Sequence, residues 1–328
     1  MINYKERYDF YKNLIEEKLL TFTTKVSPAG IYEPMKYILD GGGKRIRPML
    51  LIMSCEAVGG KAEDALNAAA AIEILHNFTL VHDDIMDNAD TRRGRETIHK
   101  RWDRDTAILA GDGLIGYAYK SLLLTKSDRI QDIAKSFTEA IIEVCEGQSY
   151  DKEFELRKKV KIDDYIMMID KKTSELLKCC AEIGGLTGNG TDKEIESLKL
   201  YALYTGLAFQ VQDDLLDITA DEKKFGKRTG GDLYEGKKTF LLLKAIEVAT
   251  DTEDKELLHY VIENKGVKND EEVKKVKSIY EKYGVLESAA RKVEEYTLMA
   301  NEELNNIKES EARLMLKWFS DMLLNRTT

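Results

Sequence analysis

Apolar residues recur every three or four positions along most of the chain, which is the spacing that one face of an α-helix requires. The pattern predicts an amphipathic helix over residues 4–20. The further long helices that it predicts span residues 62–87, 106–124, 131–147 and 163–183. No useful stretch alternates between apolar and polar positions, and no segment repeats with a period of about 20–50 residues. We therefore expect an all-α fold of about ten or more helices, packed as a single domain over residues 1–328 around a central cavity.

Glycine and proline mark the predicted breaks between helices. Pro28 and Pro48 each stand where a helix can begin, because proline lacks the N–H that a first helical turn leaves unused. No proline follows Pro48, so the rest of the chain could be helical almost without interruption. Thr191 and Glu194 have the spacing of a capping box, after a loop predicted over residues 184–190. Residues 221–239 are rich in glycine and lysine, and we expect them to form a lid.

The composition is that of a globular protein, with 43% hydrophobic and 33% charged residues. The net charge of −9 disfavours nucleic acid as a general partner, and any anionic ligand must be met by local cations or by metal. Four cysteines without CxxC spacing indicate reduced thiols rather than a zinc site or disulfides. The N-terminus is charged, unlike a signal peptide, and no apolar run approaches the ~18 residues of a membrane span. We expect a cytoplasmic protein with no transmembrane segment.

Three carboxylates follow the apolar run at residues 72–82. Asp83, Asp84 and Asp87 have the spacing DDxxD, and at about 100° per residue they share one side of a helix with His76. Like charges this close disfavour one another by ~1–4 kcal/mol per pair, a penalty that a divalent cation removes. An acidic helix end exposed to water would explain a single motif of this kind equally well.

Asp213, Asp214 and Asp217 repeat the same spacing, with Gln210 on the same helical face. Two such sets near loops rich in glycine and lysine are difficult to explain as solvated surface. Facing each other across a cavity, they would hold a cluster of Mg²⁺ ions. The cations that could surround such a cluster are Lys44, Arg47, Arg92, Arg93, Lys172, Lys227 and Lys237. This combination suits a diphosphate, because metals bridge its oxygens and arginine binds it bidentately.

Five motifs resemble those of the trans-isoprenyl diphosphate synthases and occur in that family's order. They are GGGKRIRP at 41–48, LVHDDIMDNADTRRG at 80–94, KT at 172–173, FQVQDDLLD at 209–217 and GKRTGGDLYEGKKT at 226–239. Each is weak alone, and together they are highly specific. One departure is Leu241, where many relatives carry proline, and it bears only on where the local helix starts. The resemblance implies an isoprenoid synthase-like fold and a homodimer. It also implies that isopentenyl diphosphate is condensed with the allylic substrates dimethylallyl, geranyl and farnesyl diphosphate.

The resemblance also implies a role for each candidate residue. Three Mg²⁺ ions on the allylic diphosphate would be held by Asp83, Asp87 and Asp213, with support from Asp84, Asp214 and Asp217. The same diphosphate would be bound by Arg92, Lys172 and Lys227. The diphosphate of isopentenyl diphosphate would be bound by Lys44, Arg47, His76 and Arg93. The region where the allylic cation forms would be lined by Thr173 and Gln210, and the lid would include Lys237. Taken singly, His76 would more often be an ordinary helix histidine, and Lys172 and Lys237 would be surface lysines.

Product length should depend on the residues just upstream of the first carboxylate motif. Phe78 and Thr79, five and four positions before Asp83, resemble the pattern of archaeal-type geranylgeranyl diphosphate synthases. On an ideal helix Phe78 lies about 140° from Asp83, so it would reach the product tunnel from the flank. A farnesyl or a longer product is the alternative.

Three other interpretations compete with a catalytic synthase. A class I terpene cyclase also ionises diphosphates at a DDxxD motif, but the second aspartate set and the GGGKR element favour an enzyme with a second diphosphate substrate. A regulatory subunit of a heteromeric synthase often lacks one aspartate motif, and this chain has both. A nucleic-acid binder using residues 44–47 is opposed by the net charge.

Overall fold

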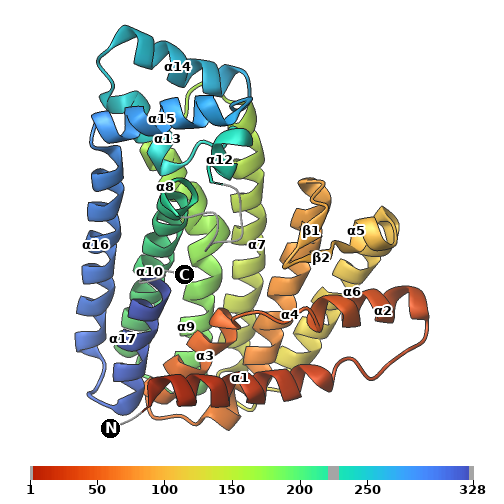
Figure 1. The fold of residues 1–328 in the computed structure, drawn as a ribbon. Helices are drawn as coiled ribbons and strands as arrows, with labels where there is room; N and C mark the ends of the chain where they lie inside the picture. Colours follow the sequence, from red (N-terminus) through yellow and green to blue (C-terminus); the bar gives the residue numbers. More distant parts are fainter. Residues whose placement is uncertain (1–2, 221–228, 325–328) are drawn as a thin grey trace. The chain divides into compact units, whose positions relative to one another are not determined.

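The computed structural model of the chain describes residues 3–220 and 229–324, and nearly all of their regular structure is helical (Figure 1). The all-α prediction is confirmed. The chain forms two compact units. The first contains the residues up to Thr138 together with Cys179–Leu198 and Asn306–Leu316. The second contains Glu139–Lys178, Lys199–Asn305 and the residues from Lys317 onward. The expectation of one domain around one cavity stays a prediction.

The first unit is organised around its longest helix, α4 (Ala62–Met86). The other elements wholly within it are α1 (Tyr4–Leu20), α2 (Ala29–Leu39), α3 (Ile46–Ala57), β1 (Thr91–Arg92), β2 (Arg95–Glu96), α5 (Ile98–Arg101) and α6 (Arg104–Leu122). A run of four buried alanines, residues 68–71, lets the neighbouring helices approach α4 closely. Helices α1, α3 and α6 pack against it, and its C-terminal end carries the first carboxylate motif.

The remaining elements begin with α7 (Ile130–Leu156). They continue with α8 (Ile162–Ile169), the π-helical turn η1 (Asp170–Ser174), α9 (Glu175–Thr187), α10 (Asp192–Thr219), α12 (Gly231–Tyr234), α13 (Phe240–Val248), α14 (Thr252–Glu263), α15 (Asp270–Lys282), α16 (Val285–Glu303), η2 (Leu304–Asn306) and α17 (Glu311–Leu324). In the second unit, α10, α13, α15 and α16 contribute side chains to one buried hydrophobic cluster. The cluster fixes the end of α10, which carries the second carboxylate motif.

Most predicted helices are present, and the capping box is confirmed. The Glu194 backbone N–H donates to the Thr191 hydroxyl at 3.3 Å, and the Thr191 N–H donates to the Glu194 carboxylate at 2.9 Å. Pro28 is the N-cap residue of α2 rather than part of its first turn. Pro48 is the third residue of α3, a first-turn position that proline tolerates because its missing N–H is not needed there.

Three predicted segments differ from the structure, and one element was not predicted. The helix predicted to end at residue 147 continues to Leu156, and the helix predicted over 163–183 is interrupted by the turn η1. The loop predicted from residue 184 begins only after Thr187, where α9 ends. The antiparallel hairpin of β1 and β2 was not predicted, because two-residue strands are too short to show an alternating pattern. Part of the predicted lid, residues 221–228, lies outside the described residues.

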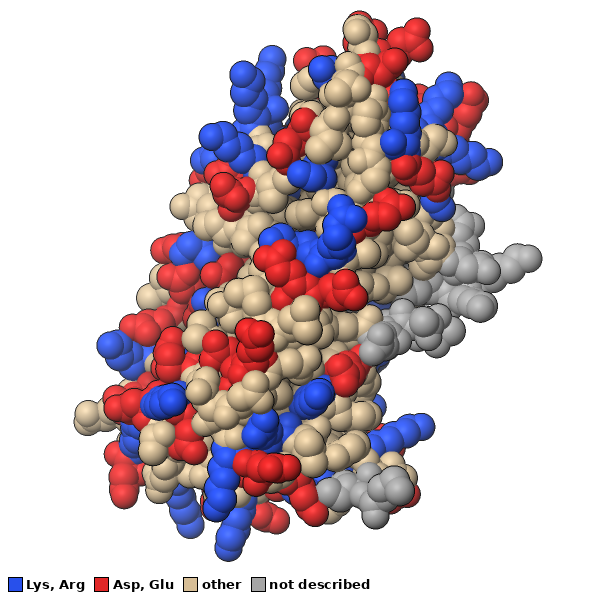
Figure 2. All heavy atoms as spheres, turned by 90° about the vertical axis from the view of Figure 1, so that its left-hand side faces the viewer, with Lys and Arg blue, Asp and Glu red and all other residues tan. Residues whose placement is uncertain are grey.

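The sequence analysis disfavoured nucleic acid as a general partner and expected no transmembrane segment, and the surface and the helices bear on these two expectations. Figure 2 shows acidic and basic side chains mixed over one face of the molecule, without a single large basic area on that face. Among residues 3–220 and 229–324, no helix is both long enough and apolar enough to cross a bilayer.

The packing of α9 against α3 allows a direct test. A Cβ atom at Gly184 would lie 2.3 Å from the Leu51 carbonyl oxygen, so the α3 backbone would have to move. We expect Gly184→Ala to lower the free energy of unfolding by about 1–3 kcal/mol. Gly30→Ala in α2 is the control, because a Cβ there would meet no atom of the described residues within 4 Å. The control should change the free energy of unfolding by less than about 1 kcal/mol, in the stabilising direction. Urea denaturation measures both, and equal effects would contradict the packing described.

Candidate functional site

A glycine loop brings the backbone before α3 close to the β1–β2 hairpin. Gly42 and Gly43 have φ angles of 67° and 139°, where a side chain would strain the backbone. A Cβ atom on Gly43 would lie 3.1 Å from the Arg93 guanidinium carbon, and Arg93 donates a hydrogen bond to the Gly42 carbonyl oxygen. Glycine is therefore needed for this loop to meet Arg93. The loop leads directly into Lys44 and Arg47.

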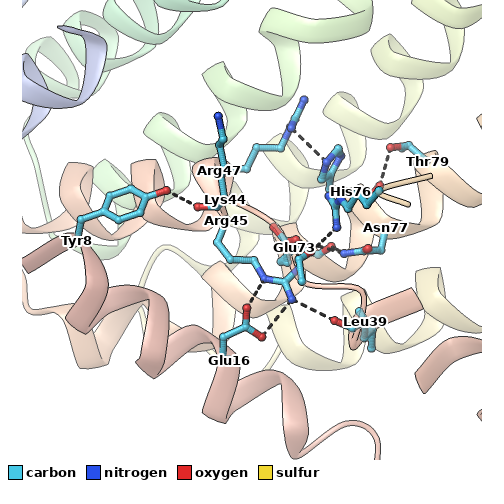
Figure 3. A network of polar contacts seen from close by, with 12 residues as sticks. Tyr8, Glu16, Leu39, Lys44, Arg45, Arg47, Glu73, His76, Asn77 and Thr79 are labelled. Atoms are coloured by element: carbon cyan, nitrogen blue, oxygen red, sulfur yellow. Dashed lines mark hydrogen bonds and ion pairs between the residues drawn. The ribbon is translucent and has the colours of Figure 1, made fainter. Parts of the chain in front are cut away.

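Arg47 and Arg93 place two positive charges around His76 within the first unit, and these three residues are here called the cation cluster. Nη1 of Arg47 lies 3.3 Å from Nε2 of His76 (Figure 3), and the buried Nε of Arg47 has no hydrogen-bond partner among the described residues. Burial, and then the charges of Arg47 and Arg93, lower the pKa of His76 well below its usual value. Burial also lowers the pKa of both arginines. An anion bound here would offset the repulsion and give Arg47 Nε an acceptor.

The first carboxylate motif places its three members in different surroundings at the end of α4. Asp84 is buried and accepts a hydrogen bond from Arg92 Nε at 2.7 Å. Burial raises the pKa of Asp84, and the Arg92 charge opposes that shift. Asp83 is half-buried, and Asp87 is the exposed C-cap residue of the helix. The middle aspartate is thus turned into the protein, while the outer two lie nearer the surface.

The second carboxylate motif has the same arrangement at the end of α10. Asp214 is buried and accepts hydrogen bonds from the Tyr165 hydroxyl at 2.6 Å and from the Phe240 backbone N–H at 3.1 Å. The Gln210 amide nitrogen donates to the same carboxylate at 3.4 Å. The amide oxygen of Gln210 accepts a hydrogen bond from the Thr173 hydroxyl at 3.2 Å. The structure therefore connects Thr173, Gln210 and Asp214 in one chain of hydrogen bonds.

A further acidic residue of the second unit, Asp232, adds to the negative charge around this motif. Its backbone N–H donates to the Asp217 carboxylate at 3.2 Å. Burial and then the Asp232 charge raise the pKa of Asp214 to about 7 and that of Asp217 to about 6. Carboxylates that resist ionisation in this way are stabilised as anions when a cation is near. Asp232 was not identified from the sequence, although it lies within the GGDLYEGKKT motif.

Lys172 and Thr173 lie in the π-helical turn η1, which the sequence analysis did not predict. Glycines of two neighbouring helices make room for it. A Cβ atom on Gly147 of α7 would lie 2.4 Å from the Lys172 backbone nitrogen, and one on Gly206 of α10 would lie 2.6 Å from the Ser174 hydroxyl oxygen. Such turns are often found at functional sites, because they redirect side chains out of the regular helical spacing.

Five predicted residues line one cavity of about 130 Å³ within the second unit. They are Lys172, Thr173, Gln210, Asp214 and Lys237. The cavity lining also includes residues that the sequence analysis missed, namely Asp151, Tyr165, Met168, Ile169, Asp232, Lys238 and Thr239. Lys172 forms an ion pair with Asp151, and Lys237 forms one with Glu235 at 2.6 Å. The cavity thus combines cations with carboxylates. Lys227 lies outside the described residues.

The two candidate chain-length residues lie on α4. Phe78 is buried, and its ring centroid is 4.6 Å from that of His82, one helical turn further along. The Thr79 hydroxyl donates to the His76 carbonyl oxygen at 2.8 Å. Thr79 therefore bonds to its own helix, while Phe78 packs along the flank of α4.

Comparison with known proteins agrees with this geometry. The sequence pattern of the polyprenyl synthetase family matches residues 28–283. The short chain isoprenyl diphosphate synthase of Methanothermobacter thermautotrophicus is 36% identical over 317 residues, 96% of each chain. The geranylgeranyl diphosphate synthase of Methanosarcina mazei is 36% identical over 301 residues, 91% of this chain and 90% of that one.

Solved structures give the same result. The crystal structure of geranylgeranyl pyrophosphate synthetase from Pyrococcus horikoshii matches with a TM-score of 0.93 and 36% sequence identity, covering 99% of this chain and 100% of that one. The resemblance and the fold that it implied are therefore confirmed, and the chain belongs to the polyprenyl synthetase family.

Proposed function

We propose that this protein is a short-chain trans-prenyl diphosphate synthase. It condenses isopentenyl diphosphate with dimethylallyl, geranyl or farnesyl diphosphate by ionisation, condensation and elimination, and its main product is geranylgeranyl diphosphate. The observation that carries the proposal is the cation cluster of Arg47, His76 and Arg93, in which the buried Nε of Arg47 finds no hydrogen-bond partner in the part of the chain that the structure describes. A site that crowds positive charge in this way suits a ligand with several anionic oxygens. The names of the two sequence relatives support the reaction class.

The donor set fits Mg²⁺, because it consists of carboxylates. Among the described residues, no three acidic, histidine or cysteine side chains lie close enough to hold an ion by themselves. Magnesium in phosphate sites usually uses one or two carboxylates together with substrate oxygens, so three ions would be completed by the allylic diphosphate. The protein ligands would be Asp83, Asp87 and Asp213. When bound, Mg²⁺ withdraws electron density from the leaving diphosphate.

The other residues act by position and charge. Lys172 and Arg92 bind the allylic diphosphate and stabilise it as the carbon–oxygen bond breaks, and Lys237 belongs to the lid. The hydroxyl of Thr173 and the amide of Gln210 line the region where the allylic cation forms. Lys44 and the cation cluster hold isopentenyl diphosphate so that its double bond attacks the cation. The released diphosphate then takes the proton that the new product loses. Lys227 is proposed to join the allylic diphosphate contacts.

The homodimer also remains a proposal. Ile108 and Leu109 of α6 are neighbours in sequence and are 39% and 56% exposed, and adjoining exposed apolar side chains can mark a protein–protein interface. Their exposure supports an interface between copies of the chain along α6.

The competing functions explain less of the site. A terpene cyclase has one diphosphate substrate and would need neither the glycine loop nor the cation cluster. A regulatory subunit would not need both carboxylate motifs. A nucleic-acid partner would require a continuous basic surface, which Figure 2 does not show on the face in view.

The reaction is tested with the purified single chain, Mg²⁺, farnesyl diphosphate and isopentenyl diphosphate. We expect diphosphate release that chelation of Mg²⁺ abolishes. Asp87→Asn should lower kcat at least about 100-fold, because a metal ligand is lost. Asp90→Asn is the matched control, since Asp90 is exposed, is not one of the three DDxxD carboxylates and pairs with Lys100 at 2.9 Å. Absence of diphosphate release from the wild type would refute the proposed function.

The pKa of His76 predicts how stability depends on pH. The folded-state pKa of His76 lies below the unfolded value of about 6.5. Just below pH 6.5, His76 is therefore protonated in the unfolded chain but not in the folded chain. The stabilising contribution is present above about pH 6.5 and is lost as the pH falls. Relative to His76→Gln, the wild type should lose about 1 kcal/mol of unfolding free energy per pH unit below that point. Urea denaturation from about pH 7.5 to 5 measures this difference, and parallel curves for the two proteins would contradict the assignment.

Phe78 is expected to limit product length. With farnesyl diphosphate as primer, Phe78→Ala should give prenols longer than twenty carbons, and Phe78→Leu should give a smaller shift with less loss of stability. Thr79→Ala should leave the product unchanged, because Thr79 is already small and bonded to its own helix. Chromatography of the dephosphorylated products measures the outcome. Unchanged length in both Phe78 variants would place the tunnel floor at another residue.

A further inference from the structure

Arg45 lies between Lys44 and Arg47 in the sequence, but its side chain points into the first unit (Figure 3). Its backbone is left-handed, with φ 51° and ψ 36°, and it is the N-cap residue of α3. Residues other than glycine rarely adopt this conformation. The Arg45 side chain is completely buried, whereas Lys44 is exposed and Arg47 reaches toward His76. The turn at Arg45 therefore directs the Arg45 side chain into the first unit and leaves Lys44 and Arg47 for the candidate site.

The Arg45 guanidinium is held by three groups. Nε and Nη2 donate to the two carboxylate oxygens of Glu16 at 2.8 and 3.1 Å, which is bidentate pairing. Nη1 donates to Glu73 at 2.6 Å, and Nη2 also donates to the Leu39 carbonyl oxygen at 3.0 Å. These contacts fix the orientation of Arg45, and the direction of the glycine loop depends on Arg45.

Glu73 links this network to the cation cluster. It is one turn before His76 on α4, and the Asn77 amide nitrogen donates to its backbone carbonyl oxygen at 2.8 Å and to its carboxylate at 3.3 Å. The ion pair between Arg45 and Glu73 therefore ties the start of α3 to the turn of α4 that carries His76.

Two residues of α1 complete the network. Glu16 supplies the bidentate pair with Arg45, and the Tyr8 hydroxyl donates a hydrogen bond to the Lys44 carbonyl oxygen. Helix α1 is itself attached to α3, because Tyr11 and Arg7 both donate to Glu56. Helix α1 lies before residue 28, where the match to the family pattern begins. Its contribution to the site is therefore visible only in the structure.

We propose that Tyr8 and Glu16 of α1 are positioning residues for the diphosphate of isopentenyl diphosphate. They act through the Lys44 carbonyl and the Arg45 guanidinium, and they hold the end of the glycine loop so that Lys44 and Arg47 present their charges in one fixed arrangement. The proposal rests on the proposed assignment of Lys44, Arg47 and His76 to that diphosphate. A loop that follows three glycines would otherwise lose more conformational freedom each time it binds.

The test uses Tyr8→Phe, Glu16→Gln and the double variant in the full chain, with steady-state kinetics for each substrate in turn. We expect KM for isopentenyl diphosphate to rise roughly 3-fold in Tyr8→Phe, roughly 10-fold in Glu16→Gln and further in the double variant. The kcat and the KM for farnesyl diphosphate should stay within about twofold of the wild type. Glu17→Gln is the matched control, because Glu17 is the next residue of α1 and is exposed. It should change no kinetic parameter.

Arg47→Ala separates failure of the proposal from failure of the function. If the wild type forms no prenyl diphosphate, or Arg47→Ala leaves the KM for isopentenyl diphosphate unchanged, the proposed function or its site assignment fails. If the wild type forms prenyl diphosphate and Arg47→Ala raises the KM for isopentenyl diphosphate, while the α1 variants match the wild type, only the positioning role fails. Equal rises in KM for both substrates, or a fall in kcat that follows the melting temperature, would show that α1 supports the fold without positioning the loop. Calorimetric titration with inorganic diphosphate provides a second readout, and weaker binding is expected in Glu16→Gln but not in Glu17→Gln.

Discussion

Like charges are held close together in each unit, and the candidate site depends on how the fold tolerates their repulsion. In the first unit burial, and then the charges of the surrounding arginines, lower the pKa of His76, and burial makes the charge of Arg47 itself costly. In the second unit burial, and then the charge of Asp232, raise the pKa of Asp214 and of Asp217. Neither arrangement favours the unliganded protein. Both become favourable when the opposite charge binds, so the free energy of binding appears as added stability of the folded state.

The fold tolerates these charges by turning one member of each motif inward. In each aspartate motif the second carboxylate is buried, and it accepts hydrogen bonds from Arg92 in one unit and from Tyr165 and a backbone N–H in the other. Arg45 is the corresponding inward residue of the GGGKRIRP motif, and it is buried against Glu16 and Glu73. A buried charge with its hydrogen bonds satisfied fixes the backbone, because moving it would leave the charge unpaired. The inward member of each motif thus holds the outward members in position.

The sequence predicted what depends on local spacing. The two DDxxD motifs, the long helix before the first and the capping box before the second all follow from helical geometry, and they are present. The turn η1 could not be predicted, because it requires room that Gly147 and Gly206 provide from other helices. Asp232 and Glu16 were also missed, since their importance comes from neighbours distant in sequence. Glu16 in particular has the pattern of any polar residue on an amphipathic helix.

Family membership limits the chemistry but leaves the product length to local packing. On an ideal helix Phe78 points about 140° away from Asp83, and the structure places its ring against His82, on the flank of α4. The His82 ring in turn lies against Gly111 of α6, where a Cβ atom would come within 2.3 Å of Nε2. The wall beside Phe78 is therefore made by two helices. We propose that removing the Phe78 ring opens space along the flank without moving the carboxylates at the helix end, so that the product lengthens while the reaction stays the same.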